Sequence, residues 1–103
     1  MTKAAMRCVK EMAEAESRED WDDAEIVRED GEIWLGYRRV HHRTLTLMLQ
    51  LCLLHDSSNQ NGVERYTLNE DGRSMAKNPD YEPRIIGIMR ASARLRVKEP
   101  PSL

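Results

Sequence analysis

The sequence predicts a small α+β domain in which β-hairpins alternate with helices and an additional helix follows at the C-terminal end. The chain has 103 residues, of which 40% are hydrophobic, so we expect one modest core. Two segments space their apolar residues as helices do, and an Asp-Gly pair separates two β-favouring runs. We expect a single domain over residues 1–98 and a flexible tail over 99–103.

The segment Lys3–Ser17 is the first predicted helix. It lacks Gly and Pro and is rich in Ala, Met and Glu, which are good helix formers. Ala5, Val9 and Met12 fall on one face at helical spacing. This face is therefore expected to pack against the core.

The segment Ala24–Tyr37 is predicted to form a β-hairpin around Asp30-Gly31, because a tight hairpin turn needs positive φ at both central positions. With this turn, Ile26 faces Leu35 across the two strands. Side chains alternate between the two faces of a hairpin. The expected core side carries Ile26, Ile33, Leu35 and Tyr37, and the opposite side carries Val27 and Trp34.

The segment His41–Leu54 is the most apolar part of the chain and is predicted to be a central helix. Only a narrow strip of it stays polar, together with Arg39, which lies two residues before the segment. The strip consists of Arg39, Arg43, Thr46 and Gln50, at helical spacing. This strip is expected to face water or a ligand.

A second hairpin and two further helices complete the predicted domain. Leu54–Ser57 and Val63–Leu68 read as strands around the polar loop Ser58–Gly62. Asn69 is a good N-cap for a short helix that runs to Lys77. Pro83 suits the first position of a last helix over residues 84–97.

Charge is distributed unevenly along the chain. The formal net charge is −2 and the sequence pI is about 5.9, which is not typical of a nucleic-acid-binding protein taken as a whole. Residues 1–33 carry a net charge of −6, however, and residues 34–103 carry +4. No acidic residue lies between Glu32 and Asp56 or between Glu82 and Glu99. Two basic surfaces beside an acidic N-terminal third are therefore expected.

The segment Arg39–Ala76 resembles the second half of a winged-helix DNA-binding domain of bacterial and phage regulators. In that family a recognition helix leads into a β-hairpin wing, and the returning strand passes directly into another helix. The residues that carry the resemblance are Tyr66, Leu68, Asn69, Gly72 and Arg73. The resemblance implies a homodimeric transcriptional regulator that acts by occupying a site on double-stranded DNA.

The residue types on the strip agree with DNA binding, because cations neutralise phosphates and Arg and Gln can reach base edges. A solvated helix face is the plainer alternative. The candidate DNA-binding residues are Arg38, Arg39, His41, His42, Arg43, Thr46, Gln50 and Arg65.

The alternative function is that of a protein-binding adaptor, or of a phage-type inhibitor, built on the same scaffold. The acidic first third and the low net charge favour it. Trp at a surface is typical of an interface. The candidate dimer or partner contacts are Val27, Trp34, Ile85, Ile86 and Met89.

No catalytic motif and no cofactor-binding motif is present, so we expect a protein that is not an enzyme. Cys52 and His55, with the upstream His41 and His42, are a weak zinc signal, and we expect no metal. Cys8 and Cys52 are expected to be buried thiols. No apolar run reaches membrane-spanning length, which predicts a soluble, cytoplasmic protein without a membrane partner.

Overall fold

The computed structural model describes residues 2–58, 62–88 and 91. The elements follow in the order α1 (Lys3–Ser17), β1 (Ile26–Glu29), β2 (Glu32–Leu35), β3 (Arg38–Arg39), α2 (His42–Gln50), β4 (Leu54–Asp56), β5 (Glu64–Leu68) and α3 (Glu70–Lys77). Residues 84–88 are also helical. The predicted α+β class is confirmed, and the arrangement is compatible with a winged-helix-like fold.

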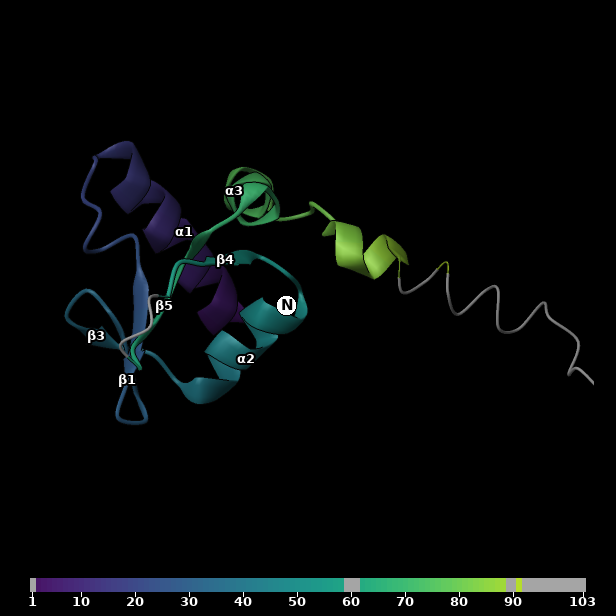
Figure 1. Ribbon diagram of the computed structural model, residues 1–103. Helices are drawn as coiled ribbons and strands as arrows, with labels where there is room; N and C mark the ends of the chain where they lie inside the picture. The colour runs from purple at the N-terminus through teal and green to yellow at the C-terminus, as the bar shows by residue number, and fades with distance from the viewer. Residues whose placement is uncertain (1, 59–61, 89–90, 92–103) are drawn as a thin grey trace, which may run out of the picture.

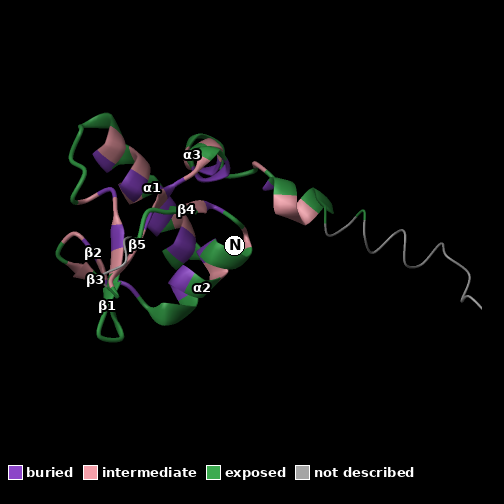
Figure 2. Ribbon diagram, in the orientation of Figure 1, coloured by how far each residue is buried: buried purple, intermediate pink, exposed green. Residues whose placement is uncertain are grey.

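The five strands form one antiparallel sheet in the order β3-β2-β1-β5-β4. All three labelled helices lie on the same side of this sheet (Figure 1). Figure 2 shows buried residues where the helices and strands face one another. The core contains the helix residues Val9, Met12, Leu45, Met48 and Met75 and the strand residues Ile26, Ile33, Leu35, Tyr66 and Leu68.

The first hairpin has the predicted register, with Ile26 opposite Leu35 and Val27 opposite Trp34. Asp30 and Gly31 both have positive φ, at 53° and 78°, as a tight hairpin turn requires. Tyr37, however, was expected on the core side and is 99% exposed.

A second turn explains the position of Tyr37. Gly36 has φ of 59°, so the alternation of faces along β2 stops there. Gly36 and Tyr37 form a two-residue turn, and Leu35 pairs with Arg38 across it. The sequence analysis placed Gly36 and Tyr37 in the second strand of the first hairpin and did not predict β3.

Helix α2 is shorter than predicted, because it ends at Gln50 and not at Leu54. The amide of Cys52 donates to the Leu49 carbonyl, and the amide of Leu53 donates to the Met48 carbonyl. These two hydrogen bonds form a Schellman motif, in which the residue just past the cap is left-handed. Cys52 occupies that position with φ of 54° and is exposed, so the prediction that it is buried was wrong.

The direct passage from β5 to α3 is explained by Asn69. Its side-chain oxygen accepts a hydrogen bond from the Gly72 amide at 2.9 Å, which is the predicted N-cap. Its side-chain nitrogen donates to the Cys52 carbonyl at 2.6 Å, and its backbone amide donates to the Leu53 carbonyl at 3.0 Å. One residue therefore ends the strand, caps the helix and ties both to the end of α2.

Asp71 of α3 holds the chain that follows the domain core. Its carboxylate accepts hydrogen bonds from the Tyr81 hydroxyl at 2.8 Å and from Arg84 Nε at 3.0 Å. Residues 84–88 project from the body beyond this contact (Figure 1). Residues 89–90 and 92–97 of the predicted last helix, the tip of the loop at residues 59–61 and the predicted tail lie outside the described residues.

The described helices are all too short or too polar to cross a lipid bilayer.

Candidate nucleic-acid interface

The N-terminus of α2 is organised by His41. This residue has extended backbone angles, and its Nδ1 accepts a hydrogen bond from the Arg43 amide at 3.2 Å. The imidazole therefore serves as the helix cap, a role that the sequence analysis had not assigned to it. The His41 and His42 rings lie 4.4 Å apart between centroids. Both side chains are exposed beside the first turn of the helix.

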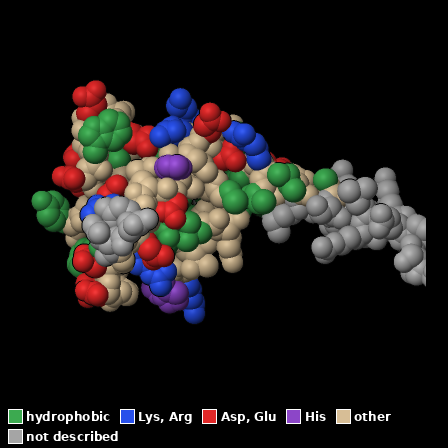
Figure 3. All heavy atoms as spheres, viewed as in Figure 1, with side chains coloured by type: hydrophobic (Ala, Val, Ile, Leu, Met, Phe, Trp, Pro, Cys, Tyr) green, Lys and Arg blue, Asp and Glu red, His purple; other side chains and the backbone are tan. Residues whose placement is uncertain are grey.

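The outward face of α2 carries Arg43, Thr46 and Gln50 of the predicted polar strip, whereas the fourth predicted member, Arg39, lies on β3 and not on the helix. Thr44, Leu45 and Met48 are buried and fix the orientation of the helix against the core. The exposed residues of the helix are His42, Arg43, Thr46, Leu49 and Gln50. In Figure 3, His and Arg side chains gather at the lower edge of the molecule, where α2 begins. The strip is thus a surface free to meet a partner.

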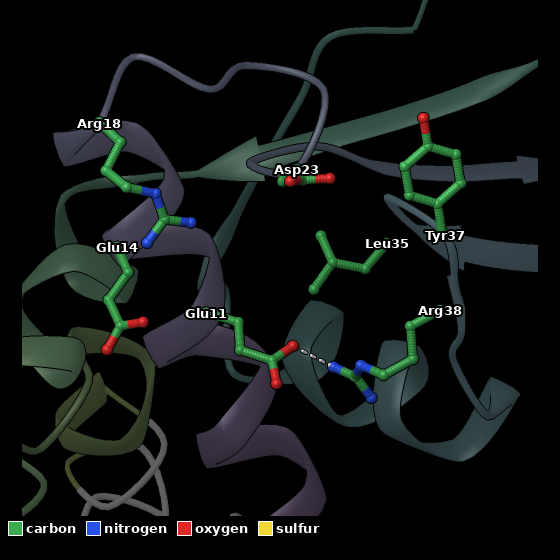
Figure 4. Close-up of a pocket in the computed structure, with 7 residues that line it drawn as sticks. All are labelled: Glu11, Glu14, Arg18, Asp23, Leu35, Tyr37 and Arg38. Atoms are coloured by element: carbon green, nitrogen blue, oxygen red, sulfur yellow. Dashed lines mark hydrogen bonds and ion pairs between the residues drawn. The ribbon is translucent and has the colours of Figure 1, made fainter.

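Arg38 does not belong to this surface. It lies on the inner side of β3, and its Nη2 donates to Glu11 Oε2 of α1 at 2.6 Å. Figure 4 shows the two side chains reaching toward one another from β3 and α1 across an open pocket. The volume of this pocket is about 490 Å³, and Leu35 and Tyr37 line it. Arg38 therefore joins the first helix to the sheet.

The partners of Glu11 explain its protonation state. Partial burial acts to raise the pKa of Glu11, but hydrogen bonds from Arg38 and Arg7 outweigh it and hold that pKa below its ordinary value. Glu11 therefore stays ionised near neutral pH and keeps Arg38 in place.

Arg39 lies on the opposite side of β3. Its guanidinium carbon is 5.1 Å from the centroid of the Trp34 ring, and its Nη1 is 3.6 Å from Glu32 Oε1. Both members of this ion pair are more than half exposed. Because such exposed pairs contribute little to stability, Arg39 can exchange Glu32 for another anion at small cost.

Arg65 lies on β5, two strands away from β2. Its Nη1 donates to Glu25 Oε1 at 2.7 Å. Val27 is its neighbour on β1 and also pairs with Trp34 on β2. Arg65 therefore lies on the outer face of the sheet and forms no part of the α2 strip.

The outer face of the sheet carries a second surface. Val27 and Trp34 are half-buried neighbours there, as the hairpin register predicted. An open pocket of about 480 Å³ lies over them. Its carboxylates come from the loop before β1 and are Asp20, Asp22, Asp23 and Glu25. We call this surface the outer-face pocket.

The sequence analysis had placed these acids only within an acidic N-terminal third and had not predicted a pocket. The signal that was available is Gly36, because a side chain there would collide with the Asp23 carboxylate. The Asp20 carboxyl beside Asp23 raises the pKa of Asp23 through hydrogen bonding and charge repulsion. The loop is thus folded back onto the sheet with its acids crowded together.

The remaining candidate contacts lie on the segment after α3. Ile85 and Ile86 are half-buried, Ile88 is 60% exposed, and Met89 lies outside the described residues. The structure thus leaves apolar side chains accessible on residues 84–88.

Within the described ranges, no group of three or more His, Cys, Asp or Glu residues is arranged to hold a metal ion.

No protein-family model matches this sequence, and neither a curated protein nor a solved structure shows significant similarity to it.

Proposed function

We propose that this protein binds double-stranded DNA through α2 and regulates transcription by occupying a site. The observation that carries the proposal is the outward strip of α2, which offers His42, Arg43, Thr46 and Gln50 and has no acidic residue along it. An α-helix with its side chains is about 10–12 Å across, which matches the width of about 12 Å of the major groove.

The role of each side chain follows from its chemistry. Arg43 and Arg39 would neutralise phosphates, and Gln50 and Thr46 would reach base edges. The β4–β5 hairpin would lie against the flanking backbone. Arg38 and Arg65, which were candidates, are assigned to the ion pairs that join β3 to α1 and β5 to the loop before β1.

The distribution of charge supports this proposal. Acidic side chains gather where α1 ends and the chain leads to β1, whereas the basic end of α2 is at a different edge of the molecule (Figure 3). DNA can therefore approach α2 without meeting the acidic loop.

A homodimer would present two copies of the strip, and Ile88, exposed beside Ile85 and Ile86, supports such a contact. Measuring how many protein chains bind each duplex at saturation tests this part of the proposal, and we expect two.

The test is fluorescence anisotropy of a labelled duplex, titrated at low and at physiological salt. The variant is Arg39→Ala with Arg43→Ala. We expect it to lower affinity and to reduce the slope of log K against log salt by about 2, because about one counterion is released for each phosphate contact.

The matched control is Arg18→Ala with Lys77→Ala, which removes the same charge from exposed ends of α1 and α3. The control is expected to keep most of the affinity. A duplex that gives no anisotropy change at low salt, or an equal loss in both double variants, would contradict the proposal.

The alternative function, a protein-binding adaptor or phage-type inhibitor, is favoured by one specific observation. The outer face of the sheet is covered by no described helix and places Trp34 beside Val27.

A further inference from the structure

We propose that the outer-face pocket binds an arginine-rich segment of a partner protein. The inference is independent of DNA binding by α2, and it supplies the protein-binding alternative with a defined partner chemistry.

The floor of the pocket is apolar and aromatic. Trp34 and Val27 pair across β2 and β1, and Tyr37 stands 99% exposed at the rim. Aromatic faces attract a guanidinium through the negative potential of the ring. The floor is therefore suited to the flat face and the methylene stem of an arginine side chain.

The wall of the pocket is acidic. Four carboxylates line it, against the one guanidinium of Arg65. Glu25 is paired with Arg65, whereas Asp20, Asp22 and Asp23 form no ion pair with any residue in the described part of the chain. A cation placed among these three would relieve their mutual repulsion.

The protein already shows this binding chemistry on the same face. Arg39 lies over the Trp34 ring, and Arg65 donates to Glu25 at 2.7 Å. Both are arginines of the chain itself: Arg65 is part of the pocket lining, and Arg39 lies outside that lining, over the Trp34 ring. A third guanidinium, from a partner, would combine both contacts in the space between them.

The charge of the pocket also selects among partners. Its excess of carboxylates repels phosphates, so the pocket itself does not favour nucleic acid. An arginine suits it better than a lysine, because a planar guanidinium stacks on a ring and still donates to carboxylates at its edge.

The experiment uses two short glycine–serine peptides that differ only in carrying arginine or its uncharged isostere citrulline. The protein is the Trp21→Phe variant of the full chain, in which Trp34 is the only tryptophan. We expect the arginine peptide to change the Trp34 emission in a saturable way. The citrulline peptide should leave it unchanged.

Two double variants of this background then locate the site. Asp20→Asn with Asp22→Asn is expected to weaken binding about tenfold, because it removes two charge contacts of moderate strength. Glu70→Gln with Asp80→Asn removes the same net charge elsewhere and is expected to change the affinity by less than about twofold. All four residues are exposed, and circular dichroism checks that each variant is folded.

Three outcomes would overturn the inference. One is the absence of binding at low salt. Another is binding that leaves the Trp34 emission unchanged. The third is an equal loss of affinity in both double variants, which would show attraction to net charge and no site.

Discussion

Glu19 and Cys52 occupy the same position at the ends of two helices. Each follows the cap residue of its helix, and each has a left-handed backbone, with φ of 58° and 54°. The amides of Glu19 and Asp20 donate to the carbonyls of Glu16 and Ala15, in the pattern seen at the end of α2. Glycine usually fills this position, since a side chain there is in steric conflict with the backbone.

Replacing Cys52 with Gly should therefore stabilise the protein. The strain of a left-handed residue, about 1–2 kcal/mol, exceeds the extra chain entropy that Gly brings to the unfolded state. We expect Cys52→Gly to raise the free energy of unfolding by about 0.5–1 kcal/mol. Urea unfolding followed by circular dichroism measures it.

The Cys52→Ala variant is the control, because it removes the exposed thiol and keeps the strained side chain. It should leave the stability within about 0.5 kcal/mol of the original. If Cys52→Ala raised the free energy of unfolding as much as Cys52→Gly does, the cause would be the loss of the sulfur and not relief of backbone strain.

At the scale of elements, the junction between β5 and α3 depends on the close approach of two segments of the chain. Gly72, in the first turn of α3, is buried against the end of α2. A Cβ atom built there would collide with the Leu53 carbonyl oxygen and would lie 2.8 Å from Leu68 Cδ2. The absence of a side chain is what allows α3 to pack directly against β5.

We expect Gly72→Ala to destabilise the protein by about 1–3 kcal/mol, the usual cost of forcing atoms into a packed core. Thermal unfolding measures it. Gly87→Ala is the matched control, since a Cβ there meets nothing within 4 Å and alanine favours a helix. A Gly72→Ala protein as stable as the Gly87→Ala protein would show that the junction can open without cost.

At the scale of the whole molecule, Asp71 connects the domain core to the segment that leaves it. Burial of this carboxylate acts to raise its pKa, but hydrogen bonds from Tyr81 and Arg84 outweigh it and lower the pKa below its ordinary value of 3.8. The arrangement therefore stabilises the folded protein only while Asp71 is ionised.

This predicts a specific pH dependence for Asp71→Asn. The variant should be less stable than the original, and the difference should be constant above the ordinary pKa of 3.8. As the pH falls below that value, the folded carboxylate also gains its proton, and the difference should shrink. Unfolding in urea across the acidic range measures both proteins. A difference that grows on acidification would contradict the assignment.

How well a feature of this fold can be predicted from the sequence depends on how far apart in the chain the interacting residues lie. The bounds of α1, the register of the first hairpin and the cap at Asn69 depend on residues close in the chain, and all three were predicted correctly. The end of α2 was missed because Cys52 stands where glycine would have been the signal.

The candidate site was predicted less completely, for the same reason. The exposure of the α2 strip follows from helical periodicity within one segment. Arg38 and Arg65 were assigned to DNA because their partners, Glu11 and Glu25, lie 27 and 40 positions away. Pairs so distant in the chain meet only through the sheet topology, which no local pattern shows.

The sheet order also controls when the protein can fold during its synthesis. Strand β1 has β2 on one side and β5 on the other, and β5 is made roughly 40 residues after β1. Until β5 leaves the ribosome, one edge of β1 presents unpaired backbone groups, and the core side of the first hairpin lacks Tyr66 and Leu68. The long stretch of chain between β1 and β5 must close into a loop before the contacts that stabilise this pairing can form. The nascent chain is therefore exposed to pairing with other strands until Leu68, the last residue of β5, has been made and has left the ribosome.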